Sequence, residues 1–234
     1  MRRPELSPRL RMVGELVPAG ARLADVGTDH AYLPAALMLE GKIPWAIAAD
    51  LRWGPLDRAR ATAREYGLAG KLAFRLCDGL TGIQPGEVDA VAAAGMGGET
   101  IAAILAAAPW VRERDVPLIL QPKSSFPDLR GWLQANGFAI EEERLAREGD
   151  ALYTAFLVRA GEMGPLAPAE LWAGKNSRDP LRGPWLDRWL ARTARALEGM
   201  AQARGGGVSA RRRALEEVLE GLDEMKKEWE QWQL

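Results

Sequence analysis

The residues best suited to chemistry lie at the end of the apolar run 23–26, where two carboxylates flank a glycine: Asp25, Gly27, Thr28, Asp29 and His30. An apolar strand that turns in this way into a helix presents a nucleotide-type ligand to the helix start. Gly27 lets the backbone approach a ligand closely. The third glycine of the dinucleotide motif G-x-G-x-x-G is missing, so the loop is not typical of a pyrophosphate-binding loop. Its two acids fit a ligand with a cationic amino acid portion and a ribose better than they fit a pyrophosphate. Because Asp-x-Gly is common at strand ends, simple turn chemistry is the alternative.

Two further apolar runs also end in an acid. Asp50 closes the run 45–50 and lies 25 positions after Asp25, close to the interval of about 20 residues at which doubly wound folds place a ribose-binding carboxylate. Asp78 and Gly79 follow the run 72–77. If these strands are parallel, all three acids emerge at the same carboxyl edge of the sheet, where such sheets bind ligands.

A glycine-rich segment follows the fourth apolar run, 88–94. Three of its four residues are glycines, in the order Gly95, Met96, Gly97 and Gly98. Glycines at this density indicate that backbone, rather than side chains, faces something close.

The elements that must position these residues alternate between strand and helix, which predicts an α/β fold. Apolar runs predict strands at 23–26, 45–50, 72–77, 88–94, 116–122, 138–146 and 151–159, with helices at 7–17, up to 39, 55–66, up to 108 and 126–136. Glu148, Gly149 and Asp150 separate the last two strands, a spacing typical of a hairpin. We therefore expect a seven-stranded Rossmann-like sheet that ends in antiparallel pairing.

The pattern changes after residue 161, so we expect one domain at 1–161 and a second region at 162–234. Residues 164–168 are typical of a linker, and helix resumes at Arg182. Apolar residues then recur in a heptad seam beyond a break at Gly205–Gly207, which predicts an antiparallel helical hairpin or coiled coil.

The first half of this hairpin is strongly basic. The segment from residue 178 to residue 213 contains only three acids but nine arginines: 178, 182, 188, 192, 195, 204, 211, 212 and 213. The tip around Arg204, Arg211, Arg212 and Arg213 is therefore a candidate phosphate-contacting surface. A solvated hairpin whose charges serve solubility and pairing is the alternative.

Composition narrows the class of protein. The chain has 234 residues, 47% of them apolar, and a formal net charge of -1, so attraction to nucleic acid must come from local charge asymmetry. One cysteine, Cys77, argues against a disulfide framework and a cysteine metal site, and fits a reducing cytosol. The N-terminal segment is not typical of a signal peptide, and the longest apolar run is too short to cross a bilayer. We expect a cytoplasmic protein without membrane contact or metal, and a monomer.

These motifs together resemble the class I S-adenosylmethionine-dependent methyltransferases. More narrowly, the chain is similar to the bacterial TrmK family, whose members methylate N1 of adenine 22 in tRNA. The likeness covers nearly the whole chain and rests on the segments 6–10 (LSPRL), 25–34 (DVGTDHAYLP), 94–98 (AGMGG), 120–122 (LQP) and the helical tail.

The resemblance implies S-adenosyl-L-methionine as cofactor and S-adenosyl-L-homocysteine as product. The loop from Gly27 to His30 would surround the methionine portion, Asp50 the ribose hydroxyls, and Asp78 with Gly79 the adenine. Asp50 departs from the family pattern, which often has Glu there. The full set of implied cofactor-binding residues is Asp25, Gly27, Thr28, His30, Asp50, Leu51, Asp78, Gly79, Gly95, Met96, Gly97 and Gly98.

The resemblance also implies a tRNA substrate. N1 lies on the Watson–Crick edge of adenine, so the base must be unpaired or turned out before reaction. Asp29 is the candidate catalytic residue, either orienting the adenine amino group or accepting a proton after transfer, whereas His30 is better explained as a structural residue. The candidate tRNA-binding residues are Arg9, Arg11, Gln121, Arg204, Arg211, Arg212 and Arg213.

Other functions fit part of the pattern. A methyltransferase acting on another RNA or a small molecule is one alternative, and a non-catalytic S-adenosylmethionine-binding adaptor is another. No Asn/Asp-Pro-Pro-aromatic sequence follows the fourth strand, which argues against the usual exocyclic-amine methylases. A nicotinamide dehydrogenase is disfavoured by the absent third glycine.

Overall fold

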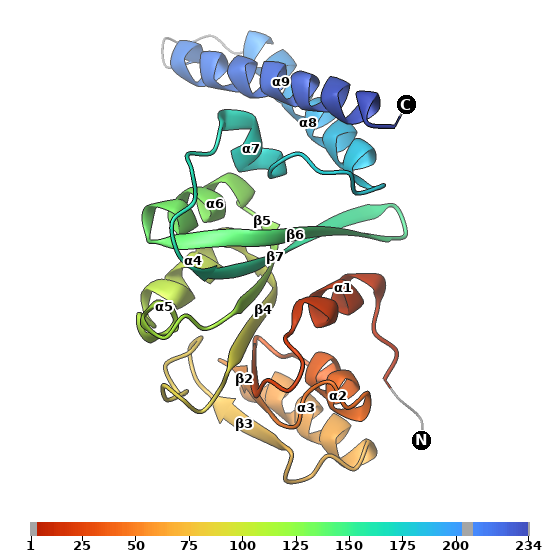
Figure 1. Ribbon diagram of the computed structural model, residues 1–234, viewed down its shortest axis with the longest axis vertical. Coiled ribbons are helices and arrows are strands. Elements are labelled where there is room, and N and C mark those ends of the chain that lie inside the picture. Colours follow the sequence, from red (N-terminus) through yellow and green to blue (C-terminus); the bar gives the residue numbers. More distant parts are fainter. Residues whose placement is uncertain (1–3, 203–207, 234) are drawn as a thin grey trace. The chain divides into compact units, whose positions relative to one another are not determined.

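A seven-stranded sheet forms the centre of the N-terminal part of the chain (Figure 1). The computed structural model describes residues 4–202 and 208–233. The strands are β1 Leu23–Val26, β2 Ala46–Asp50, β3 Leu72–Leu76, β4 Ala90–Gly97, β5 Leu118–Ser124, β6 Phe138–Glu148 and β7 Ala151–Ala160. Their order is β3-β2-β1-β4-β5-β7-β6, with β1 to β5 parallel and β7 antiparallel to both neighbours. The predicted sheet with its antiparallel final hairpin is confirmed.

Helices cover both faces of this sheet, as a parallel sheet requires. In Figure 1, α1 (Pro8–Leu16), α2 (Tyr32–Leu39) and α3 (Trp53–Glu65) lie on one side, and α4 (Gly98–Ala106) and α5 (Trp110–Glu113) on the other. Every residue of β1 and β2 is therefore buried, including the acids Asp25 and Asp50. The sequence does not predict α5.

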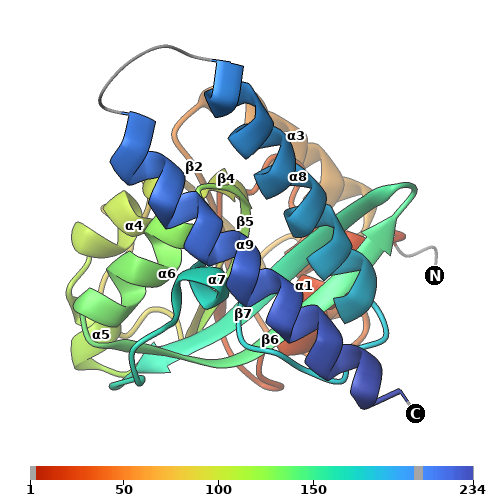
Figure 2. The same ribbon diagram turned by 90° about the horizontal axis from the view of Figure 1, so that it is seen from above.

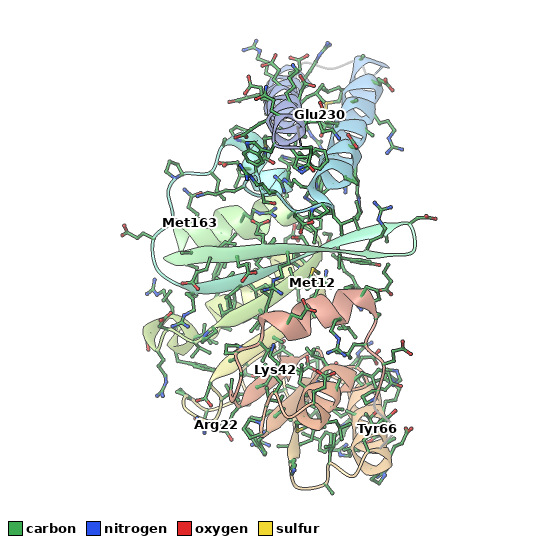
Figure 3. All side chains as sticks on the ribbon, turned by 45° about the vertical axis from the view of Figure 1, so that its right-hand side comes forward. Met12, Arg22, Lys42, Tyr66, Met163 and Glu230 are labelled. Carbon is green, nitrogen blue, oxygen red and sulfur yellow. The ribbon has the colours of Figure 1, made fainter. Side chains whose placement is uncertain are left out.

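The first helix has suitable residues at both ends. Pro8 occupies its first turn, where the missing N–H costs nothing. At its other end, Lys42 Nζ donates to the carbonyl oxygens of Gly14 and Glu15, each at 2.8 Å (Figure 3). The Gly14 carbonyl also accepts the backbone N–H of Val17 at 3.3 Å, so the lysine adds to the hydrogen bonds that close the last turn.

The fourth strand continues three residues beyond its predicted end at Ala94. Met96 and Gly97 remain paired with β5, whereas Gly95 is skipped in the pairing, and register shifts lie on either side of Met96. The prediction that the strand ends before the glycines is therefore wrong. A bulged strand end without side chains explains why glycine is suited to these positions.

The chain separates into two compact units. One comprises residues 1–125 and 132–163, and the other residues 126–131 and 164–234, so the first half of α6 (Phe126–Ala135) groups with the C-terminal unit. The boundary after residue 161 that the sequence suggests stays a prediction.

The C-terminal unit is helical. It contains α7 (Pro168–Ala173), α8 (Arg182–Gln202) and α9 (Val208–Gln231), and Figure 2 shows α8 beside α9. The two helices are antiparallel, because Lys226 near the end of α9 reaches Asp187 and the Gly183 carbonyl near the start of α8. The sequence treats 164–168 as a linker and misses α7, and the predicted glycine break at 205–207 lies outside the described residues.

Aromatic packing holds this unit together. Trp185 and Trp189 are 0% and 2% exposed and meet Phe126 edge-on, with ring centroids 5.8 and 5.5 Å away. The predicted heptad seam faces inward, since Val218 and Leu222 are 4% and 0% exposed. Large buried aromatic surfaces of this kind dominate the stability of a small core.

Two glycines with nearly the same backbone conformation allow the cost of backbone strain to be distinguished from the cost of side-chain crowding. Gly79 (φ +55°) and Gly67 (φ +66°) both adopt the left-handed region, but a Cβ at Gly79 would lie 2.8 Å from Ile104 Cγ1, whereas one at Gly67 meets nothing within 4 Å. Gly67→Ala should cost about 1 kcal/mol of unfolding free energy from backbone strain. Gly79→Ala should cost about 1–3 kcal/mol more from overpacking.

Urea unfolding of both variants measures the difference. Gly79→Ala should cost less in an Ile104→Ala background than in the wild type, because Ile104→Ala removes Cγ1 and Cγ2, the two atoms nearest to the new methyl group. Equal losses at the two positions would show that crowding by Ile104 is unimportant.

Candidate active site

A cavity of about 490 Å³ opens at the carboxyl ends of the central parallel strands. It lies where β1 is flanked by β2 and β4, the point at which the strand order reverses and α/β sheets bind ligands. The predicted site residues that line it are Arg9, Asp25, Gly27, Thr28, Asp29, His30, Asp50, Gly95 and Met96. Segments far apart in the sequence therefore meet in one site.

Two buried carboxylates form the acidic part of the cavity. Asp25 is 5% exposed and accepts a hydrogen bond from the Thr28 hydroxyl. Asp50 is 9% exposed, and its Oδ1 accepts the backbone N–H of Arg52 at 2.9 Å. Burial raises the pKa of Asp25 to about 6; the Thr28 hydrogen bond opposes the rise and the negative charge of Asp50 adds to it. Both groups are thus available to a cationic or hydroxyl-rich ligand.

Gly27 marks a close approach between two strand ends. Its φ is +71°, and a Cβ there would collide with the terminal methyl group of Met96. Any other residue would also incur the cost of the left-handed conformation. The glycine thus lets the β1 loop lie directly against the end of β4.

The loop after Gly27 is held by charge and ring contacts. Asp29 Oδ1 accepts a hydrogen bond from Arg58 Nε at 3.1 Å. The His30 Nε2 lies 3.7 Å from Asp29 Oδ2. The His30 ring stacks on the Tyr32 ring, with 5.1 Å between the ring centroids and an interplanar angle of 7°. Asp29 and Ala31 have φ values of 45° and 55°, an unusual pair of non-glycine residues in the left-handed region. Such conformations persist where the surroundings enforce them, which is common at binding sites.

Other predicted cofactor residues lie near the cavity but do not line it. Leu51 follows β2 and is 64% exposed, and Asp78 and Gly79 follow β3, whose end is tied to β2 by the Cys77 N–H donating to the Asp50 carbonyl at 3.0 Å. Gly97 and Gly98 form the junction of β4 and α4. All of these residues sit at the carboxyl edge of the sheet, as Asp25 and Asp50 do.

The structure adds residues that the sequence does not single out as site residues. Tyr32, Arg52, Arg58 and Lys123 line the cavity. Trp53, beside Leu51, is 60% exposed. Lys123 follows two positions after Gln121 near the end of β5, which is the one signal that could have identified it.

The predicted tRNA-binding residues have different surroundings. Arg9 lines the cavity, whereas Arg11 forms a bidentate pair with Glu40, with both distances 2.8 Å. Gln121 has 0% exposure, which does not fit the predicted direct contact with tRNA.

The predicted tRNA-binding arginines on α9 are exposed, unlike Gln121. Arg211, Arg212 and Arg213 are exposed there, and Arg212 pairs with Glu216 at 2.8 Å. Arg204 lies outside the described residues.

Within residues 4–202 and 208–233, no group of three or more His, Cys, Asp or Glu side chains is placed to hold a metal ion. None of the helices in these ranges is long and apolar enough to span a membrane.

Comparison with known proteins agrees with this geometry. A family model described as a methyltransferase domain matches residues 6–156. The tRNA (adenine(22)-N(1))-methyltransferase of Bacillus subtilis is 32% identical over 230 residues, which span 95% of this chain and 96% of that protein.

Two solved structures extend the match to three dimensions. The B. subtilis M1A22 tRNA methyltransferase TrmK is 31% identical, with a TM-score of 0.81 over 95% of this chain and 99% of that one. A Streptococcus pneumoniae protein in complex with S-adenosyl-L-methionine is 34% identical, with a TM-score of 0.79 over 92% of this chain and 100% of that one. A cavity at the strand-order reversal, an acid-rich loop and a likeness along nearly the whole length of both chains thus agree, and the chain belongs to the TrmK family of methyltransferases.

Proposed function

We propose that this protein transfers the methyl group of S-adenosyl-L-methionine to N1 of adenine 22 in tRNA. The observation that carries the proposal is the likeness to the B. subtilis enzyme over 95% of the chain, which includes the loop that lines the cavity. The two buried acids and the glycine-rich strand end supply the chemistry that the reaction needs.

The cavity fits a sulfonium nucleoside. Asp25 faces the amino acid portion, and its negative charge favours the cationic ammonium and sulfonium groups. Asp50 would hold the ribose hydroxyls, Asp78 with Gly79 would hold the adenine, and the exposed Leu51 would offer apolar surface to the base. Gly95, Gly97 and Gly98 would let backbone approach the methyl group closely, beside the Met96 side chain that lines the cavity. S-adenosyl-L-methionine, when bound, supplies an activated methyl group for in-line displacement.

The protein's own contribution is mainly alignment. Adenine N1 carries a free lone pair at neutral pH, so no strong base is needed before attack. Orienting the two reactants and excluding water then supply most of the acceleration. Asp29, fixed by Arg58, orients the adenine amino group or accepts a proton after transfer. His30 acts structurally by stacking on Tyr32.

Recognition of tRNA rests on shape and phosphates, with the target base turned out of its stack. The exposed arginines 211–213 at the start of α9 are the principal phosphate contacts, and Arg204 belongs to the same basic segment of the sequence. Residues 1–161 form the methyltransferase domain in this proposal, and 162–234 the RNA-contacting region.

Incubation with bulk unmodified tRNA and S-adenosyl-L-methionine tests the activity. Mass spectrometry of the digested RNA should show one added methyl group on N1 of adenine 22. A transcript with guanine at position 22 is the matched control and should remain unmodified. Cofactor binding without methyl transfer would instead favour a non-catalytic adaptor, and methylation at another nucleotide would overturn the assigned substrate.

The affinity for S-adenosyl-L-methionine should depend on pH through Asp25. Because the pKa of Asp25 is about 6 in the cofactor-free protein, its carboxylate is mostly ionised at pH 7 and becomes neutral below pH 6. The dissociation constant should therefore rise as the pH falls from 7 to 5, by up to about tenfold per pH unit below the pKa. Calorimetry across this range measures the effect.

Asp25→Asn is the control for this experiment. Its charge loss should not weaken folding near neutral pH, because burial raises the folded pKa above the unfolded value of 3.8 and so disfavours the ionised form. The variant should bind the cofactor more weakly at pH 7 and with a flatter pH profile. Identical profiles for the variant and the wild type would exclude Asp25 as the source.

Reversing the charge of the α9 arginines should weaken tRNA binding. The triple variant R211E/R212E/R213E should lose most of its affinity, and the slope of log affinity against log salt should fall by about 2–3, because each lost phosphate contact removes about 0.7–0.9. Cofactor affinity should be unchanged. Lys227→Glu, at an exposed position of the same helix, is the control and should have a much smaller effect. Wild-type tRNA affinity in the triple variant would contradict the assignment.

A further inference from the structure

We propose that Arg9 and Lys123 form a subsite for the phosphodiester of the target nucleotide, and that Gln121 positions Arg9 for this contact. The inference rests on the proposed function and assigns roles within the same cavity. It would make Gln121 a positioning residue that never touches RNA.

Among the described residues, Arg9 and Lys123 are the cavity cations whose charged groups form no ion pair; the Glu148 carboxylate accepts only the backbone N–H of Arg9, at 3.4 Å. Four basic side chains line the cavity: Arg9, Arg52, Arg58 and Lys123. Arg58 pairs with Asp29, and Arg52 lies 3.9 Å from Asp50. Among the described residues, no carboxylate forms an ion pair with Arg9 or Lys123. The two side chains therefore present uncompensated positive charge to whatever enters the cavity.

The two cations meet above Gly95. A Cβ at Gly95 would lie 3.4 Å from Arg9 Nη1 and 3.3 Å from Lys123 Cε, so both side chains pass over the same bare backbone. Gly95 has a φ of +80° and lies at the first of the two register shifts between β4 and β5, where it is left out of the pairing. A tetrahedral anion can approach two cations arranged in this way from the open side of the cavity.

Gln121 fixes the guanidinium of Arg9. Its Oε1 accepts from Arg9 Nη1 at 2.8 Å, and its Nε2 donates to the Pro122 carbonyl at 2.8 Å. Full burial and two hydrogen bonds leave the amide one orientation. Arg9 also lies over the Tyr153 ring, with Cζ 5.7 Å from the centroid. The guanidinium is thus held on one edge by an amide and on one face by an aromatic ring.

A phosphate suits this subsite better than the reacting base does. Methyl transfer moves positive charge from the sulfonium onto the adenine ring, and a nearby guanidinium and ammonium would oppose that charge. The same cations attract a phosphodiester strongly, and phosphate contacts are what fix the register of a protein on nucleic acid. The acidic half of the cavity at Asp25 and Asp50 and the basic half at Arg9 and Lys123 therefore serve different parts of the reaction.

Mononucleotide inhibitors test the chemical class. Adenosine, adenosine 5′-monophosphate and adenosine 3′-monophosphate are compared as inhibitors of tRNA methylation. In the wild type, at least one monophosphate should inhibit several-fold more strongly than adenosine. Arg9→Gln and Lys123→Gln should bring this ratio close to one, whereas Arg64→Gln, at an exposed α3 position outside the cavity, should leave it unchanged. A ratio near one in the wild type, or a ratio unchanged in both variants, overturns the subsite.

Salt dependence gives a second readout with tRNA itself. The slope of log kcat/KM against log salt should fall by about one in Arg9→Gln and in Lys123→Gln, as expected for one lost phosphate contact each. Unchanged slopes in both overturn the subsite. Wild-type methylation of adenine 22 is measured first, because its absence would overturn the proposed function, whereas wild-type activity with unchanged slopes overturns this inference alone.

A double-mutant cycle tests the role of Gln121. Gln121→Met keeps the length of the side chain but removes the acceptor, so it should lower kcat/KM with tRNA several-fold in the wild-type background and have little effect in the Arg9→Gln background. The same loss in both backgrounds would show that Gln121 acts independently of Arg9.

Arg9→Lys serves if Gln121→Met does not fold. Lysine keeps the charge but loses the planar group that Gln121 and Tyr153 hold. We expect a several-fold lower kcat/KM with an unchanged salt slope. A wild-type kcat/KM would overturn the positioning role.

Discussion

Two carboxylates buried side by side at the end of a parallel sheet are the constraint on which the rest of the structure depends. Asp25 and Asp50 belong to adjacent strands, and since Asp25 pairs with Ala48, two residues before Asp50, both side chains lie on the same face of the sheet. Burial and mutual repulsion raise the pKa of Asp25 to about 6, so its charge is present at neutral pH but poorly compensated. A cationic ligand relieves both costs at once, which makes the sheet edge selective for a sulfonium amino acid over a phosphate.

The opposite wall of the cavity comes from α1 and the end of β5. Arg9 enters from the helix, and the buried amide of Gln121 receives it. The bare backbone of Gly95 separates this basic region from the acidic strand ends. One cavity thus contains both an acidic and a basic region. Alignment of this kind suits a displacement in which no side chain needs to remove a proton first.

The C-terminal unit is stabilised by contacts that leave its charges available. Its core consists of Trp185, Trp189 and Phe126, and the buried guanidinium of Arg182 donates to the carbonyl oxygens of Ala173 and Gly174. The arginines 211–213 take no part in this core. Their charge can therefore serve RNA binding without affecting how the helices pack.

The sequence by itself determined the order of the elements, the seven-stranded plan and the acids at one sheet edge, because apolar periodicity and turn residues act over short distances. It also identified Gly27 and Gly95 as glycines of the candidate site. Only the tertiary structure decided that Gln121 is buried, that Arg9 rests on it from 112 positions away, and that Arg58 holds Asp29. It also decided that β4 continues through its glycines and that α7 forms. These features depend on contacts between distant segments, and a charged side chain in the sequence carries no sign of the partner it will meet.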